Sequence, residues 1–554
     1  MPAHAYRRRP FRPAPEQQGK TGRGGVAIVG GGPVGLTCAL ELAAHGIPST
    51  VLEEGDTVSE GSRALCWSKR SLEILNRHGV AARMVATGYT WNTGRVFHGA
   101  RELYQFGLQP QGPQEFPAFT NLQQYLAEEF LHEAVERQPL IEMRWLNRVS
   151  GVEPAADHVR ITVETPSGPY RMEADWVVAA DGARSSVRRA LGLDFTGRVF
   201  EDHFLIADVD VHAELPNADR RFWFQPEFGG GDTALCHRQG LGMWRVDFQL
   251  GWNIDREAEK RPERVLPRVR AMLGDHPMEI TWASIYTFQA RRLARFRHGR
   301  IIFAGDAAHQ VSPFGARGGN SGIQDAENLA WKLAYVIKGL APDRLLDSYD
   351  AERGQAADEN IRITSRTTDF LTPRTPASRT LRDAVLHLAA DAPFARALVN
   401  SGRLSTPTIH TDTPLSTPDG EPWAGGPPTG APCPNLALAA PDGFLLHHLG
   451  GGFRLLIFLG EAAAVPPGIA SLLEGLSIMP APVIEPLLVA RDAATAPVRT
   501  LRDGDGSVHQ AFAAPTGAAY LVRPDQHVAA RWRAPSLPAI GRALARALGM
   551  EEKA

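Results

Sequence analysis

Three glycines and a distant acid carry the most specific chemical pattern in this sequence. Gly30, Gly32 and Gly35 have the spacing G-x-G-x-x-G, and Glu53 follows about 20 residues further on. Such a turn lets backbone N–H groups and a helix N-terminus approach a pyrophosphate, while the acid accepts hydrogen bonds from a ribose diol. The pattern predicts a dinucleotide site. Because the acid repels a 2′-phosphate, the tightly bound nucleotide should not be NADP.

The elements needed to position these residues surround them. Residues 26–29 form an apolar run typical of a buried parallel strand, a helical pattern begins at Leu36, and Gly46 ends it. Residues 49–52 predict a second strand that ends at Glu53. A glycine-rich turn without a ligand is the simpler alternative. The complete strand–helix–strand unit makes that alternative the weaker one.

Two later junctions repeat the arrangement of a strand, a glycine and an acid. Asp181-Gly182 and Gly305-Asp306 each follow an apolar run. Either acid alone is more often the N-cap of an ordinary helix. Three such junctions in one chain favour a single extended nucleotide, with the acids on its ribose or ribityl hydroxyls.

The composition excludes several classes of protein. The 554 residues are too many for one core, so about two to four domains are expected. The net charge of −2 creates no field for nucleic acid or a membrane surface, and no apolar run approaches the roughly 20 residues of a membrane span. The four cysteines form neither C-x-x-C nor a metal cluster, which predicts a reduced, cytoplasmic protein without a metal site.

Turn residues and periodicity divide the chain into regions. We assign residues 24–90, 119–200 and 290–345 to one discontinuous, Rossmann-like α/β domain that binds the nucleotide. Residues 91–118 and 201–289 predict an antiparallel-sheet domain for the substrate. The remaining regions are a dispensable, disordered tail (1–23), a helical segment (346–404), a linker rich in Pro and Gly (405–434) and a last mixed domain (435–554).

The three motifs together resemble those of single-component FAD-dependent aromatic hydroxylases. These are the flavoprotein monooxygenases typified by p-hydroxybenzoate hydroxylase, phenol hydroxylase and 3-(3-hydroxyphenyl)propionate hydroxylase. The resemblance covers roughly residues 24–400. It is carried by Gly30-x-Gly32-x-x-Gly35, by Asp181-Gly182-Ala-Arg-Ser-Ser-Val-Arg and by Gly305-Asp306-Ala-Ala-His. It implies bound FAD, and it is specific to the flavin fold rather than to a substrate.

The resemblance also implies roles for individual residues. The first motif would hold the pyrophosphate and Glu53 the adenosine ribose, while Asp181 and Arg184 belong to a motif linked to both FAD and NAD(P)H. Arg63 and Gln124 match positions that contact FAD, although the adjacent Gln123 leaves the glutamine ambiguous by one residue. The implied cofactor-binding residues are Gly30, Gly32, Pro33, Val34, Gly35, Glu53, Glu54, Arg63, Gln124, Asp181, Gly182, Arg184, Gly305, Asp306, Pro313, Gly315, Ala316, Gly318, Gly319 and Asn320.

The glycine-rich loop from Pro313 to Asn320 resembles the segment beside the isoalloxazine ring. Its N–H groups, at the start of a predicted helix, would stabilise negative charge on the reduced flavin. The common form of this loop has Gly-Gln-Gly where this chain has Ala316-Arg317-Gly318. Arg317 therefore either adds a positive charge near the flavin or points to solvent.

For the reaction, the resemblance implies that NAD(P)H reduces FAD, that O2 is captured as a flavin C4a-hydroperoxide, and that a phenolic or related aromatic ring is hydroxylated. The chain has one G-x-G-x-x-G unit and no second nucleotide fold, so NADH or NADPH should bind transiently. The sequence does not choose between the two. The candidates for the substrate pocket are Tyr286, His237 and Arg238, and none of them is identified as the catalytic base.

Other functions are excluded or left open by single features. A flavin-dependent halogenase shares the first motif, but the Trp-x-Trp-x-Ile-Pro segment is absent. Epoxidation or Baeyer–Villiger oxygenation of a polycyclic aromatic remains an alternative, as does a non-catalytic flavin-binding protein. Residues 435–554 resemble a thioredoxin-like domain without C-x-x-C, which excludes dithiol chemistry and leaves a structural role or a homodimer contact.

Overall fold

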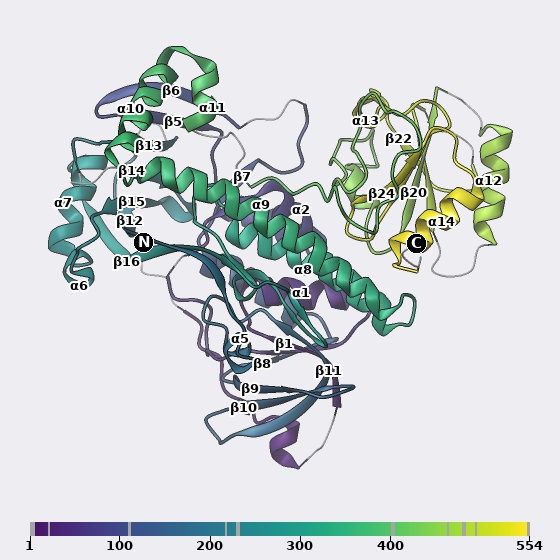
Figure 1. The fold of residues 1–554 in the computed structure, drawn as a ribbon, viewed down its shortest axis with the longest axis horizontal. Helices are drawn as coiled ribbons and strands as arrows, with labels where there is room; N and C mark the ends of the chain where they lie inside the picture. The colour runs from purple at the N-terminus through teal and green to yellow at the C-terminus, as the bar shows by residue number, and fades with distance from the viewer. Residues whose placement is uncertain are drawn as a thin grey trace.

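The fold was analysed in a computed structural model of the chain (Figure 1). It has a mixed α/β architecture, with four separate sheets among the described residues. None of the helices in the described part of the chain is long and apolar enough to cross a membrane. The residues that the structure describes are 6–19, 23–61, 63–108, 112–215, 219–228, 233–399, 405–461, 465–478, 484–492 and 496–550.

The first sheet has a parallel core flanked by helices. The C-terminal parts of β1 and β11, residues 26–29 and 176–179, are buried on both faces because they form apolar runs without alternation. Helices α1 and α8 lie side by side across it (Figure 1). The strands run in the order β17 (Arg297–His298), β18 (Ile301–Phe303), β11 (Tyr170–Ala179), β1 (Arg23–Val29), β2 (Ser49–Leu52) and β8 (Ile141–Arg144), with β10 (Val159–Glu164) and β9 (Arg148–Pro154) added to β11.

The second sheet is a broad, mainly antiparallel layer. Its strands run in the order β19 (His309–Gln310), β16 (Met278–Arg292), β12 (Thr196–Val211), β15 (Met243–Leu250), β14 (Thr233–Arg238), β13 (Arg220–Phe224), β5 (Thr93–His98) and β6 (Arg101–Gly107). It joins the two segments that the sequence assigned to one substrate domain. The boundaries at 200/201 and 289/290 fall inside the long strands β12 and β16, which pass from one domain into the other without a break.

The helices cover both sheets and bridge to the C-terminal domain. The longest, α9, runs beside α8 across the middle of the molecule (Figure 1). The helices are α1 (Pro33–Ala44), α2 (Lys69–Asn76), α3 (Ala81–Thr87), α4 (Gln124–Glu136), α5 (Ser186–Ala190), α6 (Arg256–Glu259), α7 (Pro262–Leu273), α8 (Gly318–Ile337), α9 (Asp347–Leu371), α10 (Pro376–Asp391) and α11 (Pro393–Val399). A small sheet of β3 (Cys66–Ser68), β7 (Phe119–Asn121) and β4 (Tyr89–Thr90) lies between the two domains.

The C-terminal domain is built on a five-stranded sheet and shares a core with the rest of the chain. Leu455 and Leu521 of this sheet belong to the same buried cluster as Trp331 and Tyr335 of α8. Its strands and helices are β22 (Thr500–Arg502), β21 (Glu485–Ala490), β20 (Arg454–Gly460), β23 (Ala519–Val522), β24 (Val528–Trp532), α12 (Pro467–Ser477), α13 (Ser507–Phe512) and α14 (Leu537–Ala547). The predicted linker, residues 405–434, packs against this domain: the Thr417 N–H donates to the carbonyl of Ala529.

The N-terminal segment differs from the expected disordered tail. Residues 15–18 form a short 3₁₀ helix, Ala14 is buried in the main core, and the Arg9 N–H donates to the carbonyl of Asp56. Arg144 donates to Glu16 over 3.0 Å. The expectation was wrong for residues 6–19 because their partners lie tens of residues away, where a local pattern rich in Pro and Arg gives no sign of them.

Removing the Arg9 side chain is expected to destabilise the protein. Its guanidinium is 5% exposed and donates over 2.8 Å to Glu129, which is 13% exposed. Arg9→Ala leaves this carboxylate largely buried and unpaired, so the free energy of unfolding should fall by roughly 3 kcal/mol in urea titrations. Arg7→Ala is the matched control: Arg7 is 65% exposed and 4.0 Å from Glu136, so its loss should be below about 1 kcal/mol. Equal stability of the two variants would contradict the docked segment.

Candidate active site

Four parallel strands of the first sheet end at one level. Val29 of β1 pairs with Leu52 of β2 and with Ala179 of β11, and Ala179 pairs with Phe303 of β18. The carboxyl ends of adjacent parallel strands are where open α/β sheets bind their ligands. The residues immediately beyond this level are Gly30, Glu53, Ala180, Asp181, Ala304, Gly305 and Asp306.

Glycines allow the three motifs to touch. Gly30 has φ +105°, and a Cβ there would lie 2.5 Å from the carbonyl oxygen of Ala180. Gly305 has φ +61°, and its Cβ would lie 2.9 Å from a methyl of Val34; a Cβ on Gly322 would lie 2.5 Å from the same methyl. Both turns need a left-handed backbone, and all three contacts need the absence of a side chain. The glycines thus bring the first and third motifs into contact at the start of α1.

Gly32 has open space where the other glycines have none. A Cβ on Gly32 would meet no atom of the described chain within 4 Å. Gly32 is the N-cap of α1, and no side chain caps this helix end. The first N–H groups of α1 and the positive end of its dipole therefore face open space, which suits a phosphate group.

Glu53 holds the glycine turn in shape. Its Oε2 accepts from the Gly31 N–H at 2.6 Å and its Oε1 accepts from the Gly55 N–H at 2.8 Å. Burial raises the pKa of Glu53, and the two backbone hydrogen bonds offset part of this shift. The carboxylate is therefore fixed at the strand end at which a ribose diol was expected.

The two neighbouring glutamines lie in different places. Gln124 Oε1 accepts from the Ala64 N–H at 2.8 Å, next to Arg63, and its Nε2 donates to Glu128 at 2.7 Å. Gln123 is buried and donates to the carbonyl of Gly240 at 3.0 Å. Of the two, Gln124 is the one beside the predicted arginine.

Asp181 caps a helix and keeps one oxygen unused. Its Oδ2 accepts from the N–H groups of Ser186 at 2.7 Å and Val187 at 3.1 Å, at the start of α5. Its Oδ1 is shut off from solvent and has no hydrogen-bond partner in the described part of the chain. The side chain of Arg184 is exposed. Asp181 therefore caps α5 and also keeps an acceptor free for a ligand.

Arg188 joins the second and third motifs, a role that the sequence did not reveal. Its guanidinium donates to the carbonyl of Ala307 at 2.9 Å and to that of Ala183 at 2.7 Å. Gln310 also donates to the carbonyl of Ala183, at 3.1 Å. Arg188 is the second of three arginines in the stretch 184–189, so nothing in its local pattern distinguished it from a surface charge.

Asp306 of the third motif lies at the open end of the sheet, and Asp325 of α8 holds the turn that carries it. Asp306 is exposed, yet enough protein surrounds its carboxyl that desolvation raises its pKa, with His309, Arg63 and Arg188 opposing this shift. Behind it, Asp325 of α8 accepts from the Gly305 N–H at 3.0 Å and contacts His309 Nε2 at 2.6 Å. Asp325 was missed because its partners lie 16 and 20 residues earlier.

The structure bears on two expectations for the loop from Pro313 to Asn320. The Asn320 side chain binds protein on every side: its oxygen accepts from Ser68 and Ser71 and its amide donates to Cys66 and Ala316. Only its backbone remains for a cofactor. Arg317 does not point to solvent, because it is 2% exposed and donates to Asn360 of α9 at 2.8 Å.

The three substrate-pocket candidates are only partly brought together. Tyr286 lies against Arg63; burial raises the pKa of its hydroxyl, and a hydrogen bond with Arg63 opposes this. His237 is buried on β14. Arg238 lies apart, with its guanidinium 5.1 Å from the centre of the Tyr89 ring. Tyr286 therefore lies beside the predicted flavin contact Arg63, whereas Arg238 packs against a ring of the small sheet.

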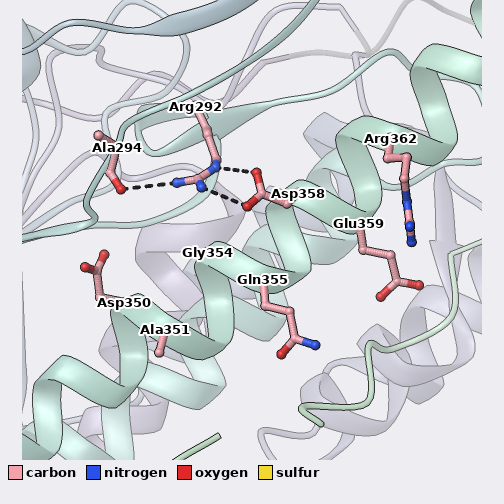
Figure 2. Close-up of a pocket in the computed structure, with 9 residues that line it drawn as sticks. All are labelled: Arg292, Ala294, Asp350, Ala351, Gly354, Gln355, Asp358, Glu359 and Arg362. Atoms are coloured by element: carbon pink, nitrogen blue, oxygen red, sulfur yellow. Dashed lines mark hydrogen bonds and ion pairs between the residues drawn. The ribbon is translucent and has the colours of Figure 1, made fainter. Parts of the chain in front are cut away.

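A separate concavity lies on the outer side of α9. Figure 2 shows its wall, where Arg292 makes a two-pronged ion pair with Asp358. The cavity has a volume of about 590 Å³. It is lined by Arg292, Ala294, Asp350, Ala351, Gly354, Gln355, Asp358, Glu359 and Arg362, none of which belongs to the predicted site.

Comparison with known proteins agrees with this geometry. The FAD binding domain family matches residues 23–364. The 6-methylpretetramide 4-monooxygenase of Streptomyces rimosus is 30% identical over 91% of this chain and 90% of its own length. The 3-(3-hydroxy-phenyl)propionate/3-hydroxycinnamic acid hydroxylase of Mycolicibacterium smegmatis is 29% identical over 79% of each chain.

Solved structures extend the similarity in two ways. The flavin-dependent monooxygenase PieE, solved with FAD and substrate, has the same fold, with a TM-score of 0.79 and 23% identity over 96% of this chain and 99% of PieE. The p-nitrophenol 4-monooxygenase of Pseudomonas putida is 28% identical, with a TM-score of 0.61, over 70% of this chain and 100% of its own.

The parallel strands end at one level, the glycine turns touch one another, and Asp181 keeps one acceptor free. These features define a flavoprotein that holds an extended dinucleotide. The chain belongs to the FAD binding domain family, and it is a flavin-dependent monooxygenase. The expected cofactor FAD is thereby confirmed.

Proposed function

We propose that this protein uses NAD(P)H and O2 to hydroxylate a phenolic or related aromatic compound. The observation that carries this proposal is a wall of rings at the glycine-rich loop. Phe204 of β12 and Phe288 of β16 lie 5.5 Å and 5.4 Å from the ring of Phe314, which belongs to that loop. Rings in this arrangement favour a flat, apolar substrate. A relative named as a 3-(3-hydroxy-phenyl)propionate hydroxylase and one named as a p-nitrophenol 4-monooxygenase support the same substrate class.

Different residues of the chain would bind the pyrophosphate, accept hydrogen bonds from hydroxyl groups and exclude water. The first glycines and the start of α1 bind the pyrophosphate, and Glu53, Asp181 and Asp306 accept hydrogen bonds from hydroxyl groups. FAD, when bound, supplies the redox chemistry that links NAD(P)H, O2 and the aromatic ring. The positive dipole end at the start of α8 would stabilise negative charge on the flavin ring system. The aromatic wall excludes water from the reacting centre.

A larger, polycyclic aromatic substrate is the second candidate, with hydroxylation, epoxidation or Baeyer–Villiger oxygenation as its chemistry. The similarity to the 6-methylpretetramide 4-monooxygenase and to PieE extends over nine-tenths or more of the chain, including the C-terminal domain. The p-nitrophenol enzyme, in contrast, matches only 70% of the chain.

Three finer statements belong to the same proposal. The C-terminal domain is thioredoxin-like: β20, β21 and β22 are parallel, and β23 and β24 continue the sheet in antiparallel fashion. Its role is structural or a homodimer contact, because residues 435–554 contain no cysteine. The protein acts in the cytoplasm, in keeping with cysteines that all remain unpaired.

The proposal is tested with the purified protein and a panel of aromatics. We expect a yellow protein that NADH or NADPH bleaches under nitrogen. In air, phenol, 4-nitrophenol, 3-(3-hydroxyphenyl)propionate or a polycyclic phenol should stimulate oxidation of the donor and gain one oxygen by mass spectrometry. Bound FAD that no donor reduces would favour the non-catalytic flavin-binding protein instead. Reduction without an oxygenated aromatic product would contradict the hydroxylase.

A further inference from the structure

Two polar side chains on neighbouring strands of the second sheet lack hydrogen-bond partners. His237 of β14 is 4% exposed, and both of its ring nitrogens are shut off from solvent and unpartnered in the described part of the chain. Asp247 of β15 is half-buried, and its Oδ1 is shut off and unpartnered in the same sense. A buried polar group left without a partner is costly, so three such atoms on one sheet need an explanation.

Both side chains point to the same face of the sheet. Arg245 pairs with His237, and Asp247 lies two residues further along β15, on the same face as Arg245. Asp247 also pairs with Ile206, and Ile206 pairs with Ser284. Residues two apart share a face, so Phe204 and Tyr286 lie on the Asp247 side as well.

This face looks toward the flavin-binding domain. Tyr286 lies close enough to Arg63 for the guanidinium to lower the pKa of its hydroxyl, and Phe204 contacts Phe314 in the glycine-rich loop. At a third point, a Cβ on Gly61 would overlap the Trp282 ring. His237 and Asp247 therefore face the region in which the aromatic substrate has to meet the flavin. The opposite face is filled by an apolar cluster with α7.

One segment of the flavin-binding domain connects this face to the flavin loop. Arg220 of β13 contacts Cys66 Sγ at 3.8 Å, and the carbonyl of Cys66 accepts from Asn320 at 2.8 Å. A Cβ on Gly319 would lie 3.4 Å from the Cβ of Ala64. The segment 64–66 thus contacts both the start of β13 and the start of α8.

Building on the proposed function, we propose that Asp247 is the catalytic base that takes the proton of the substrate's phenolic hydroxyl. The phenolic O–H bond breaks and a new O–H bond forms on Asp247 Oδ1. The electron pair stays on the phenolic oxygen and spreads into the ring, which makes the ring carbons nucleophilic. The N–H of neutral His237 donates to that oxygen, and the guanidinium of Arg220 lies nearby to balance its negative charge. The substrate class is therefore an aromatic with a free hydroxyl, rather than an ether.

The charges around Asp247 agree with this role. Desolvation raises the pKa of Asp247 to about 7; Arg245 and Arg220 oppose the rise, and Asp208 adds to it. Arg245 is committed to Asp208 through Nε at 2.8 Å, and Cys66 stays a neutral thiol because burial raises its pKa. Burial, together with Arg220 and Arg245, lowers the pKa of His237, which keeps it neutral. A base is active when ionised, so turnover should rise as the pH increases through about 7.

The test uses the flavin-loaded protein and the phenol that it hydroxylates fastest. In Asp247→Asn, we expect the FAD content and the reduction of FAD by NAD(P)H to match the parent. The dissociation constant of the phenol, followed by flavin absorbance, should change by no more than about threefold. Hydroxylation at pH 8 should fall about 10²–10⁴-fold, and the rise of turnover through pH 7 should disappear. Asp247→Glu should restore part of the rate together with the rise.

The exposed Glu279→Gln on β16 is the matched control and should behave as the parent. Hydroxylation by Asp247→Asn at the parental rate and with the parental pH profile would overturn the assignment of Asp247 and leave the monooxygenase intact. A loss of phenol binding equal to the loss of rate, with an unchanged pH profile, would also overturn it, because the carboxylate would then only position the ring. A parent protein that oxygenates no aromatic would overturn both proposals.

Discussion

Gly32→Val is expected to give a folded but colourless protein. The valine has room, because a Cβ at this position meets no atom of the described chain within 4 Å. The backbone there is extended, with φ −81° and ψ −176°, which suits a β-branched residue. The added methyls would fill the space in which the pyrophosphate approaches the start of α1. Loss of one or two charge-assisted hydrogen bonds should weaken FAD binding by about 3 kcal/mol or more, at least about 100-fold.

The measurement is the flavin-to-protein ratio after purification, followed by titration with FAD and by thermal unfolding of the apoprotein. Gly107→Val is the matched control: Gly107 ends β6, its Cβ also meets nothing within 4 Å, and its variant should stay yellow. Gly30→Ala should differ from both, because its Cβ would lie 2.5 Å from the carbonyl oxygen of Ala180 and its φ is +105°. That variant should misfold rather than merely lose FAD. Normal flavin content in Gly32→Val would contradict the placement of the pyrophosphate.

The parts of the site that could be predicted from the sequence are those with local signals. Gly30 predicts a left-handed turn, and an apolar run such as residues 26–29 predicts a strand buried on both faces. Because parallel strands end at a common edge, the acids after three such strands could be placed together without coordinates. The sheet pairing then shows that these strands end at the same height in the sheet, because Val29, Leu52, Ala179 and Phe303 are in register.

The parts that could not be predicted depend on contacts between distant residues. Asp247 occupies one of many polar positions in a strand, and only pairing with β12 and β14 shows which face it takes. Arg317 lies within a glycine-rich loop, and no local pattern indicates that it would donate to Asn360, 43 residues further along the chain. The N-terminal segment has the composition of a linker, yet Arg9 docks on a carboxylate 120 residues away. Such partners are set by tertiary structure and not by local periodicity.

A buried group of charges joins the C-terminal domain to the flavin-binding domain. Arg523, which follows β23, donates to Glu352 of α9 at 2.6 Å and 2.9 Å, and Lys332 of α8 donates to the same carboxylate at 2.7 Å. Asp525 accepts from Arg523 at 3.0 Å. All four side chains have no solvent exposure, and their formal charges cancel. Although desolvation opposes it, Arg523 and Lys332 hold the pKa of Glu352 well below its usual range, so it stays ionised.

Arg523→Met is expected to lower the free energy of unfolding by about 3–5 kcal/mol, because Glu352 and Asp525 are left with one cation between them. The C-terminal domain should loosen first, which limited proteolysis and mass spectrometry would detect as cleavage beyond residue 405. Arg198→Met is the surface control: its ion pair with Asp369 is 39% and 49% exposed, so the loss should stay below about 1 kcal/mol.

The double variant Glu352→Met/Arg523→Met separates charge from shape in this cluster. It removes one charge of each sign and leaves Lys332 and Asp525, so the site returns to neutrality. Replacing a buried ion pair by apolar side chains of similar volume is often neutral, which predicts that the double variant recovers most of the stability lost in Arg523→Met. Additive losses in the cycle would instead mean that the geometry of the hydrogen bonds, rather than uncompensated charge, holds the domains together.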